Sequence, residues 1–204
     1  MQPASHTRPS REVRASYSDS RIVVYQAFKP SIADAAVIEQ AFVPPFSRTR
    51  MTWIKPSFLW CCYRSGWAQK PGQERMLAIT ISRAGLHAAL EAACLASYDA
   101  AVHGSQQIHA DLLRNKPNRV QWDPERNLTL QALPDIRSLQ LGLGPAQVLL
   151  YVDHWVTQIE DVTPLARTVQ RLVATRQFEQ ARAALPVART YPLPLGIKKG
   201  LGAT

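Results

Sequence analysis

The densest set of reactive side chains in this sequence lies between residues 47 and 75, SRTRMTWIKPSFLWCCYRSGWAQKPGQER. Guanidinium and ammonium groups bind phosphates through charge and directed hydrogen bonds. Aromatic faces stack on nucleobases or on a nicotinamide ring. Both kinds of side chain alternate in this segment: Arg48, Arg50, Lys55 and Arg64 with Trp53, Trp60, Tyr63 and Trp67. The segment predicts a nucleotide pocket; alternatively, the tryptophans belong to the core and the cations form a solvated rim.

The start of the expected helix in this segment resembles an anion-binding site. Ser57 follows Lys55-Pro56 at the start of an expected helix, and the free N–H groups of a helix N-terminus bind anions. Lys55, the Ser57 hydroxyl and these amides could hold a phosphate. The alternative is an ordinary first turn in which Ser57 caps the helix.

Glu74 is the one acid among six Lys or Arg residues in 48–75, and it directly precedes an expected buried strand. A carboxylate held on a rigid strand beside cations could orient a ribose hydroxyl or stabilise an oxocarbenium-like state. The alternative is a salt bridge to Arg64 or Arg75.

Other chemistries lack their motifs. The sequence contains no phosphate-binding Gly-x-x-x-x-Gly-Lys-Ser/Thr loop, no Gly-x-Gly-x-x-Gly and no Gly-x-Ser-x-Gly. The five histidines and three cysteines show no metal-ligand spacing, so no metal is expected. Cys61, Cys62 and Cys94 are expected as buried reduced thiols, which favours a cytoplasmic location.

A second basic block covers residues 165–204, with seven Lys or Arg against one Glu. Arg167 and Arg171 are four residues apart and would share one helix face. With a net charge of +9, this surface favours nucleic acid as a partner, and a solvated basic face is the alternative. No run of 18 apolar residues occurs, so no membrane partner is expected; the oligomeric state is left open.

The elements that must position these residues follow from hydrophobic pattern, prolines and glycines. Strands are expected at 21–28, 51–54, 75–82, 119–122, 138–143 and 156–159, with 128–130 as a hairpin partner. Helices are expected at 31–42, 56–66, 84–98, 145–154 and 163–185. The mixed order without a regular βαβ rhythm predicts an α+β fold, with a mixed, mostly antiparallel sheet flanked by helices.

Composition and length fit one compact domain, because 204 residues with 46% hydrophobic content can bury a sizeable core. We expect a flexible N-terminal arm at 1–13, the domain at 14–185, and a tail at 186–204. That tail is rich in proline and glycine, so it is expected to be loose or to fold over the body as an extended strap.

Several runs identify a family. IVVYQAF, IADAAV, RMTWIKPSFLWCCYRSGWA, GQERMLAITISR, WDPER, RSLQLGL and IEDVT resemble the domain-of-unknown-function family numbered 4291, from about Arg14 to about Val169. This resemblance implies a single compact α+β domain and carries no settled activity.

The order of parts also resembles ADP-ribosyltransferase-type folds. That resemblance implies NAD as a candidate cofactor, with Tyr25 stacking on nicotinamide, Thr52 or Ser57 contacting ribose, and Gln73-Glu74 supplying the catalytic pair. Tyr25 or Gln26 stands where such folds usually have His or Arg, the gap before Gln73 is short, and the chain continues long past Glu74.

The sequence is consistent with three functions. The first is a nucleotide- or nucleic-acid-handling protein, in its most specific form an NAD-dependent ADP-ribosyltransferase-like enzyme acting on nucleic acid. The second is a non-enzymatic nucleic-acid-binding module. A small-ligand or protein-interaction domain with a tryptophan-rich core is a third reading.

Overall fold

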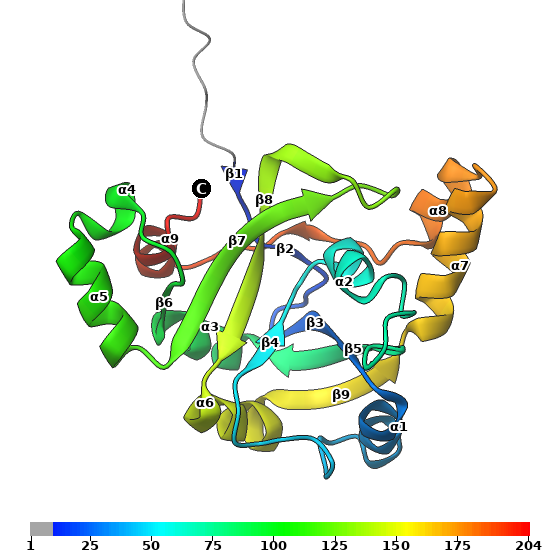
Figure 1. Cartoon of the computed structure of the whole chain (residues 1–204), viewed down its shortest axis with the longest axis horizontal. Helices are drawn as coiled ribbons and strands as arrows, with labels where there is room; N and C mark the ends of the chain where they lie inside the picture. Colours follow the sequence, from blue (N-terminus) through cyan, green and yellow to red (C-terminus); the bar gives the residue numbers. More distant parts are fainter. Residues whose placement is uncertain (1–9) are drawn as a thin grey trace, which may run out of the picture.

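The computed structural model describes residues 10–204 (Figure 1). Its strands are β1 (Ser10–Arg11), β2 (Arg14–Ala15), β3 (Arg21–Phe28), β4 (Thr52–Ile54), β5 (Arg75–Ser82), β6 (Ala93–Leu95), β7 (Asn118–Arg126), β8 (Ala132–Leu143), β9 (Val156–Asp161) and β10 (Arg189–Thr190). Its helices are α1 (Pro30–Glu39), α2 (Phe58–Ser65), α3 (Arg83–Glu91), α4 (Ala100–His103), α5 (Gln106–Asn115), α6 (Pro145–Leu150), the π-helical turn η1 (Tyr151–Trp155), α7 (Thr163–Ala174), α8 (Phe178–Ala184) and α9 (Leu195–Leu201).

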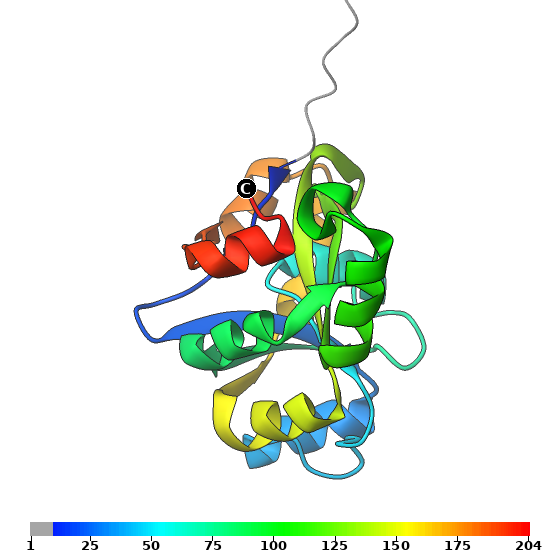
Figure 2. The same ribbon diagram turned by 90° about the vertical axis from the view of Figure 1, so that its left-hand side faces the viewer.

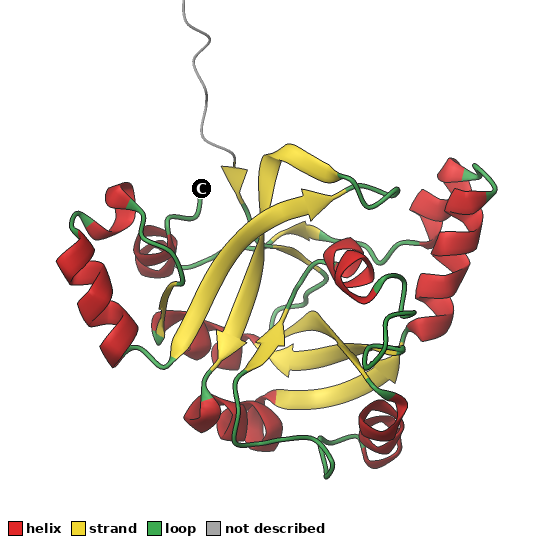
Figure 3. Cartoon of the chain, viewed as in Figure 1, coloured by secondary structure: helices red, strands yellow, loops and turns green. Residues whose placement is uncertain are grey.

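The strands form two main sheets and a short two-stranded ribbon (Figure 3). The first main sheet is antiparallel, in the order β3-β5-β9. The second has the order β1-β8-β7-β6, with β4 also pairing with β8. It is mixed, because β1–β8 and β6–β7 are parallel pairs. The α+β class and the mixed character of the sheet are confirmed, but the strands form two main sheets and not one mostly antiparallel sheet.

The two main sheets meet at β4. The amide of Tyr25 in β3 donates to the carbonyl of Lys55, just beyond β4, at 2.7 Å, and the Lys55 amide donates back to Tyr25 at 3.3 Å. The segment from 52 to 55 therefore belongs to the second sheet and also touches the first. Several residues of the predicted pocket, among them Gln26, Thr52, Trp53 and Lys55, lie at this junction.

Alternation along β4, β7 and β8 gives the second sheet two different faces. Leu139, Leu141 and Leu143 of β8 are buried in the main core, together with Ile54 and Val120 of the adjacent strands. Successive strand residues point to opposite faces. The residues between them therefore lie on the other face: Trp53, Lys55, Gln121, Asp123, Ser138, Gln140 and Gly142.

Several helices and strands end where the sequence did not indicate. The helix expected at 84–98 ends at Glu91 and is followed by the buried strand β6, which pairs with β7. The helix expected at 163–185 is two helices, α7 and α8. Residues 128–130 form the turn between β7 and β8, not a strand. Alanine-rich composition favoured a helix through β6, but burial against neighbouring strands decides its conformation.

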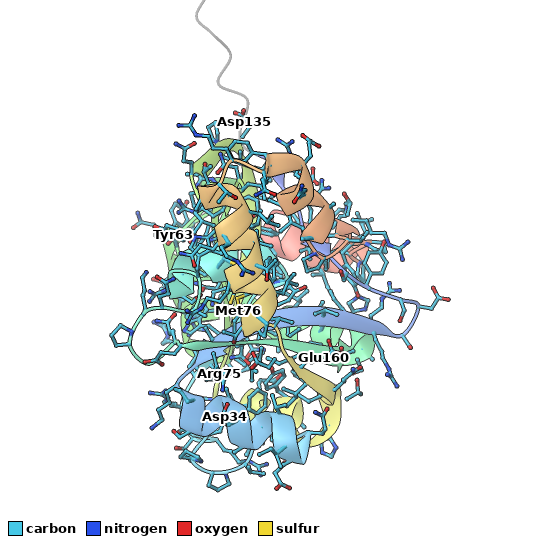
Figure 4. All side chains as sticks on the ribbon, turned by 90° about the vertical axis from the view of Figure 1, so that its right-hand side faces the viewer. Asp34, Tyr63, Arg75, Met76, Asp135 and Glu160 are labelled. Atoms are coloured by element: carbon cyan, nitrogen blue, oxygen red, sulfur yellow. The ribbon has the colours of Figure 1, made fainter. Side chains whose placement is uncertain are left out.

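A second, smaller core cluster holds α7 and α8 against the first sheet. Cys62 of α2, Met76 of β5, Val169 of α7 and Ala181 of α8 are buried in it. On the other side of β5, Arg75 forms ion pairs with Asp34 of α1 at 3.2 Å and Asp161 at 3.0 Å. Figure 4 shows Arg75 close to Asp34, below Met76.

The C-terminal residues 186–204 pack on the body and include α9, which agrees with the predicted tail folded over the body and not with the loose alternative. Tyr191, Leu193, Ile197 and Leu201 are buried in the main core, and α9 packs against α3, α4 and β6 (Figure 2). Of the arm expected at 1–13, residues 1–9 lie outside the described residues. In the described part, β1 pairs with β8 and Val13 is buried.

Candidate functional site

A cavity of about 900 Å³ opens where the two sheets meet. Its walls come from β3 and the start of α1, from β4 and the loop before it, from α2, and from the polar face of β7 and β8. The lining residues are Gln26, Ala27, Phe28, Lys29, Ile32, Arg50, Met51, Thr52, Trp53, Lys55, Trp60, Cys61, Arg64, Gly72, Gln73, Gln121, Asp123 and Gln140. This volume lies in the upper part of the range typical of small-molecule and cofactor sites.

Lys55 is the buried cation of this cavity. Its relative exposure is only 7%, and its ammonium lies 4.8 Å from the centre of the Trp60 ring. Among the described residues, no carboxylate lies within ion-pair distance of Lys55. Burial lowers the pKa of Lys55, and Arg64 lowers it further, while Cys61 and Asp123 oppose that shift. The result is a desolvated cation with its charge uncompensated by a bonded acid.

Asp123 is the nearest acid of the cavity lining. It was expected in a solvated turn, but it lies within β7 and lines the cavity. Burial raises the pKa of its carboxyl, and Lys55, Arg126 and Arg137 partly offset that rise. Asp123 therefore moderates the charge of Lys55 from a distance.

Three exposed cations lie around the same cavity: Lys29, Arg50 and Arg64. Arg50 comes from the loop before β4, and Arg64 from the last turn of α2. Exposed cations at an opening attract anions through the solvent, whereas Lys55 would meet them inside. The arrangement therefore places exposed positive charge around the cavity and one buried cation within it.

Gln26 fixes the wall between the two sheets. Its amide nitrogen donates to Thr52 Oγ1 at 2.8 Å and to the Trp53 carbonyl at 3.1 Å. The buried Tyr151 hydroxyl donates to its amide oxygen at 2.8 Å. Gln26 and Thr52 both line the cavity, and their hydrogen bonds hold β4 in place.

The structure thus brings together seven of the predicted ligand-binding residues: Gln26, Arg50, Thr52, Trp53, Lys55, Arg64 and Gln73. Tyr25 lies elsewhere. Its ring is buried and packs edge-to-face on Phe58 at 5.4 Å, and burial raises its pKa. Stacking of nicotinamide on Tyr25 is therefore wrong, because that side chain belongs to the second core cluster.

Two more predicted residues, Ser57 and Arg48, do not line the cavity, and both have structural partners. The Ser57 hydroxyl accepts from the Trp60 amide at 3.1 Å and donates to Glu125 at 2.8 Å. Ser57 is thus the N-cap of α2, which is the alternative that the sequence left open. Arg48 forms an ion pair with Asp153 of the π-helical turn.

Glu74 lies beside the cavity, and its side chain is not among the lining residues, unlike Gly72 and Gln73. One carboxylate oxygen accepts from the Gly72 amide at 2.9 Å. The other is buried without a hydrogen-bond partner among the described residues. Among the described residues, Glu74 forms no salt bridge with Arg64 or Arg75, and Arg75 binds Asp34 and Asp161 instead.

Arg167 and Arg171 lie on the exposed side of α7, away from the cavity lining. Arg167 donates to the carbonyl of Ala68 at 2.7 Å, and Arg171 donates to Thr168 at 3.1 Å. They share one face of the helix, as their spacing predicts, and line a shallow hollow there.

The sequence did not single out Gln121, Asp123 and Gln140 as site residues. One available signal was the polar–apolar alternation of SLQLGL, which includes Gln140. Alternation predicts that a strand has one polar and one apolar face, but it does not indicate whether the polar face lines a cavity. That depends on the pairing of β8 with β4 and β7.

The three cysteines are buried free thiols, as predicted, and burial raises the pKa of Cys61 to about 11. No group of three His, Cys, Asp or Glu side chains in residues 10–204 comes together as a metal site requires. None of the helices there is both long enough and apolar enough to cross a membrane.

The comparison with known families agrees with the sequence motifs. No curated protein matches this chain. The model of a domain of unknown function, DUF4291, matches residues 12–191. This match covers most of the chain and includes every strand and helix that lines the cavity. The chain therefore belongs to the domain-of-unknown-function family DUF4291.

Proposed function

We propose that the cavity between the two sheets binds a phosphate-bearing nucleotide. The observation that carries this proposal is Lys55, a buried ammonium with no ion-pair partner among the described residues. A buried charge without a partner is costly, so a ligand that supplies negative charge at this point would recover that cost. Phosphate is a common ligand of this kind for lysine.

The rest of the cavity suits the remainder of a nucleotide. Trp53 and Trp60 supply aromatic surface, and the glutamines supply neutral hydrogen-bonding groups. Arg50 and Arg64 add exposed charge at the opening. Phosphates, a sugar and a planar base thus each find matching chemistry.

In its more specific form, the proposal makes NAD the nucleotide and ADP-ribosyl transfer the reaction. In that reaction the bond from ribose C1′ to nicotinamide nitrogen breaks, nicotinamide leaves, and a nucleophile on the acceptor nucleic acid bonds to C1′ and loses its proton. Glu74 is the carboxylate next to Gln73 at the cavity wall, and it has an unpartnered oxygen. Its neighbours Gly72 and Gln73 line the cavity.

Binding is tested by calorimetric titration of AMP, ADP and NAD into the wild-type protein and into Lys55→Met. Lys199→Met, at an exposed lysine of α9, is the matched control. We expect binding to wild type and Lys199→Met, and at least a tenfold loss in Lys55→Met. Equal affinities in all three proteins, or no binding to the folded wild type, would contradict the proposal.

Turnover is tested separately by nicotinamide release from NAD in the presence of cellular RNA and DNA. Glu74→Gln should keep the fold and nucleotide affinity but lose release. Release retained in this variant removes Glu74 from the reaction. If the wild type binds nucleotides but releases no nicotinamide, the proposed nucleotide pocket stands and the proposed transferase activity is rejected.

A nucleic-acid-binding module is the second candidate, and one surface favours it. Arg126 lies 3.5 Å above the exposed ring of Tyr63, and Lys70 lies 6.0 Å from the same ring. Cations around an aromatic face are typical of single-strand binding. The test is RNA affinity over a salt series, with Tyr63→Ala and the Arg167/Arg171 double variant; affinity that does not change with salt rejects it.

A further inference from the structure

The lining of the cavity includes a pair of glutamines to which the proposed function gives no specific role. Gln121 of β7 and Gln140 of β8 are directly opposite each other in the antiparallel register. Their side chains are joined by one amide–amide hydrogen bond, from Gln140 Nε2 to Gln121 Oε1, at 2.6 Å. Both line the cavity, and both are half-buried.

This pair has a fixed hydrogen-bonding capacity. Each amide has an oxygen that accepts and an NH₂ group that donates. One bond between the two side chains uses the oxygen of one and the nitrogen of the other. The remaining oxygen and nitrogen have no partners among the described residues. Exchanging oxygen and nitrogen in both amides gives the same result: the pair always presents one free amide oxygen, which accepts, and one free NH₂ group, which donates.

An aromatic ring lies next to this pair. Trp53 is opposite Gly142 in the β4–β8 register, and Gly142 is two residues from Gln140 on the same face. A Cβ atom on Gly142 would lie 2.9 Å from Trp53 ring atoms, so the indole covers the glycine closely. A planar group bound beside it would meet the donor and the acceptor of the amide pair two strand residues, roughly 7 Å, away.

The cationic part of the cavity lies on the same sheet face. Lys55 follows Trp53 by two residues, and continuing the register places it opposite Gln140. A ligand that contacts the amide pair is thus within reach of the buried ammonium. Three functions (aromatic contact, paired donor and acceptor, and positive charge) meet on β4, β7 and β8.

We propose that Gln121 and Gln140 select the planar part of the bound nucleotide, by pairing with an adjacent donor and acceptor on its edge. This inference rests on the proposed function and adds specificity to it. The matching chemistry is found on a nucleobase edge, as in adenine with its amino group and ring nitrogen, and on the carboxamide of nicotinamide. Sugar phosphates lack such a group and use only the cationic part.

Calorimetric titrations with ribose 5-phosphate, AMP, purine riboside 5′-monophosphate and nicotinamide mononucleotide test this. Ribose 5-phosphate measures the cationic part alone, and purine riboside 5′-monophosphate differs from AMP by the missing amino group. With two neutral hydrogen bonds, we expect AMP or nicotinamide mononucleotide to bind roughly tenfold tighter than ribose 5-phosphate. If AMP is the preferred ligand, purine riboside 5′-monophosphate loses part of this gain. If only nicotinamide mononucleotide binds more tightly than ribose 5-phosphate, the carboxamide is the group that the glutamines recognise.

The variant Gln140→Leu should remove the tenfold preference and leave ribose 5-phosphate affinity unchanged. Gln107→Leu, on the exposed side of α5, is the matched control and should keep the preference. If Gln140→Leu does not fold, the same test is made with Gln121→Leu, which should also lose the preference over ribose 5-phosphate that the wild type shows.

A preference that persists in the glutamine variants overturns the inference, and so does a wild type that binds all four ligands equally. In both cases ribose 5-phosphate still binds, and the proposed function stands. Absence of binding by every phosphorylated ligand instead rejects the proposed function, and this inference with it.

Discussion

The ammonium group of Lys55 lies 4.8 Å from the centre of the Trp60 ring, inside the cavity between the two sheets. A cation over an indole face is stabilised by the ring quadrupole, by about 2 kcal/mol when desolvated. This contact offsets only part of the cost of burying an ammonium. The ligand-free protein therefore keeps the Lys55 charge poorly compensated.

Removal of this charge should make the free protein more stable. Lys55→Met keeps an unbranched chain of similar length and removes the buried ammonium. We expect a higher free energy of unfolding at neutral pH, measured by urea denaturation, together with loss of nucleotide binding. Lys199→Met should change neither quantity. A less stable Lys55→Met protein would contradict the description of Lys55 as an uncompensated charge.

The pH dependence of stability should show the same residue. The folded-state pKa of Lys55 lies below its ordinary value of 10.5, so between these values the unfolded chain binds more protons. Stability rises with pH wherever that holds. The penalty of Lys55 is thus complete below the folded-state pKa and disappears as the pH rises toward 10.5.

Other groups oppose this trend, since burial raises the pKa of Tyr25 and Cys62. The quantity to measure is therefore the difference in unfolding free energy between Lys55→Met and wild type, from neutral to alkaline pH. That difference should shrink as the pH rises. A constant difference would show that the pKa of Lys55 is not lowered by folding.

Nucleotide binding should be accompanied by proton uptake. A phosphate beside Lys55 raises the pKa of the ammonium again, so at a pH above the free-state pKa the complex takes up a proton. Calorimetry in two buffers of different ionisation enthalpy measures this uptake. It should be absent in Lys55→Met at ligand concentrations that still saturate the site. Equal binding enthalpies in both buffers across the alkaline range would contradict it.

Ser57 should prove to be a structural residue. Its hydroxyl caps α2 and bonds to Glu125, so Ser57→Ala should lower stability by about 0.5–2 kcal/mol and leave nucleotide affinity unchanged. Thermal unfolding and calorimetric titration measure the two effects. A stable variant with weakened binding would instead return Ser57 to the ligand site.

Gly142 should be required for the position of Trp53. An added Cβ would lie 2.9 Å from the indole and 3.0 Å from Met51 Sδ, so Gly142→Ala should destabilise the fold by about 1–3 kcal/mol and weaken nucleotide binding. Gly196→Ala, where nothing lies within 4 Å, is the control and should be neutral or slightly stabilising. Equal stability of both variants would show that Trp53 can move freely.

Local pattern predicted much of this protein. The strands at 21–28 and 75–82 have the predicted bounds, because β-branched and aromatic runs between turn residues are specific signals. The dense cationic and aromatic segment also located the cavity, since neighbours in sequence remain neighbours when they line one short strand and one short helix. The odd number and the spacing of the cysteines, all in expected helices, indicated buried thiols.

Tertiary structure decided which polar side chains meet. Tyr25 and Gln26 are adjacent in sequence, yet alternation along β3 places Tyr25 in a core cluster and Gln26 at the cavity. Gln121 and Gln140 join the same site through a pairing across 19 residues. Such non-local pairings depend on strand register, which propensity and spacing do not specify. The residue types of the proposed nucleotide site are thus a property of the sequence, whereas their convergence is a property of the fold.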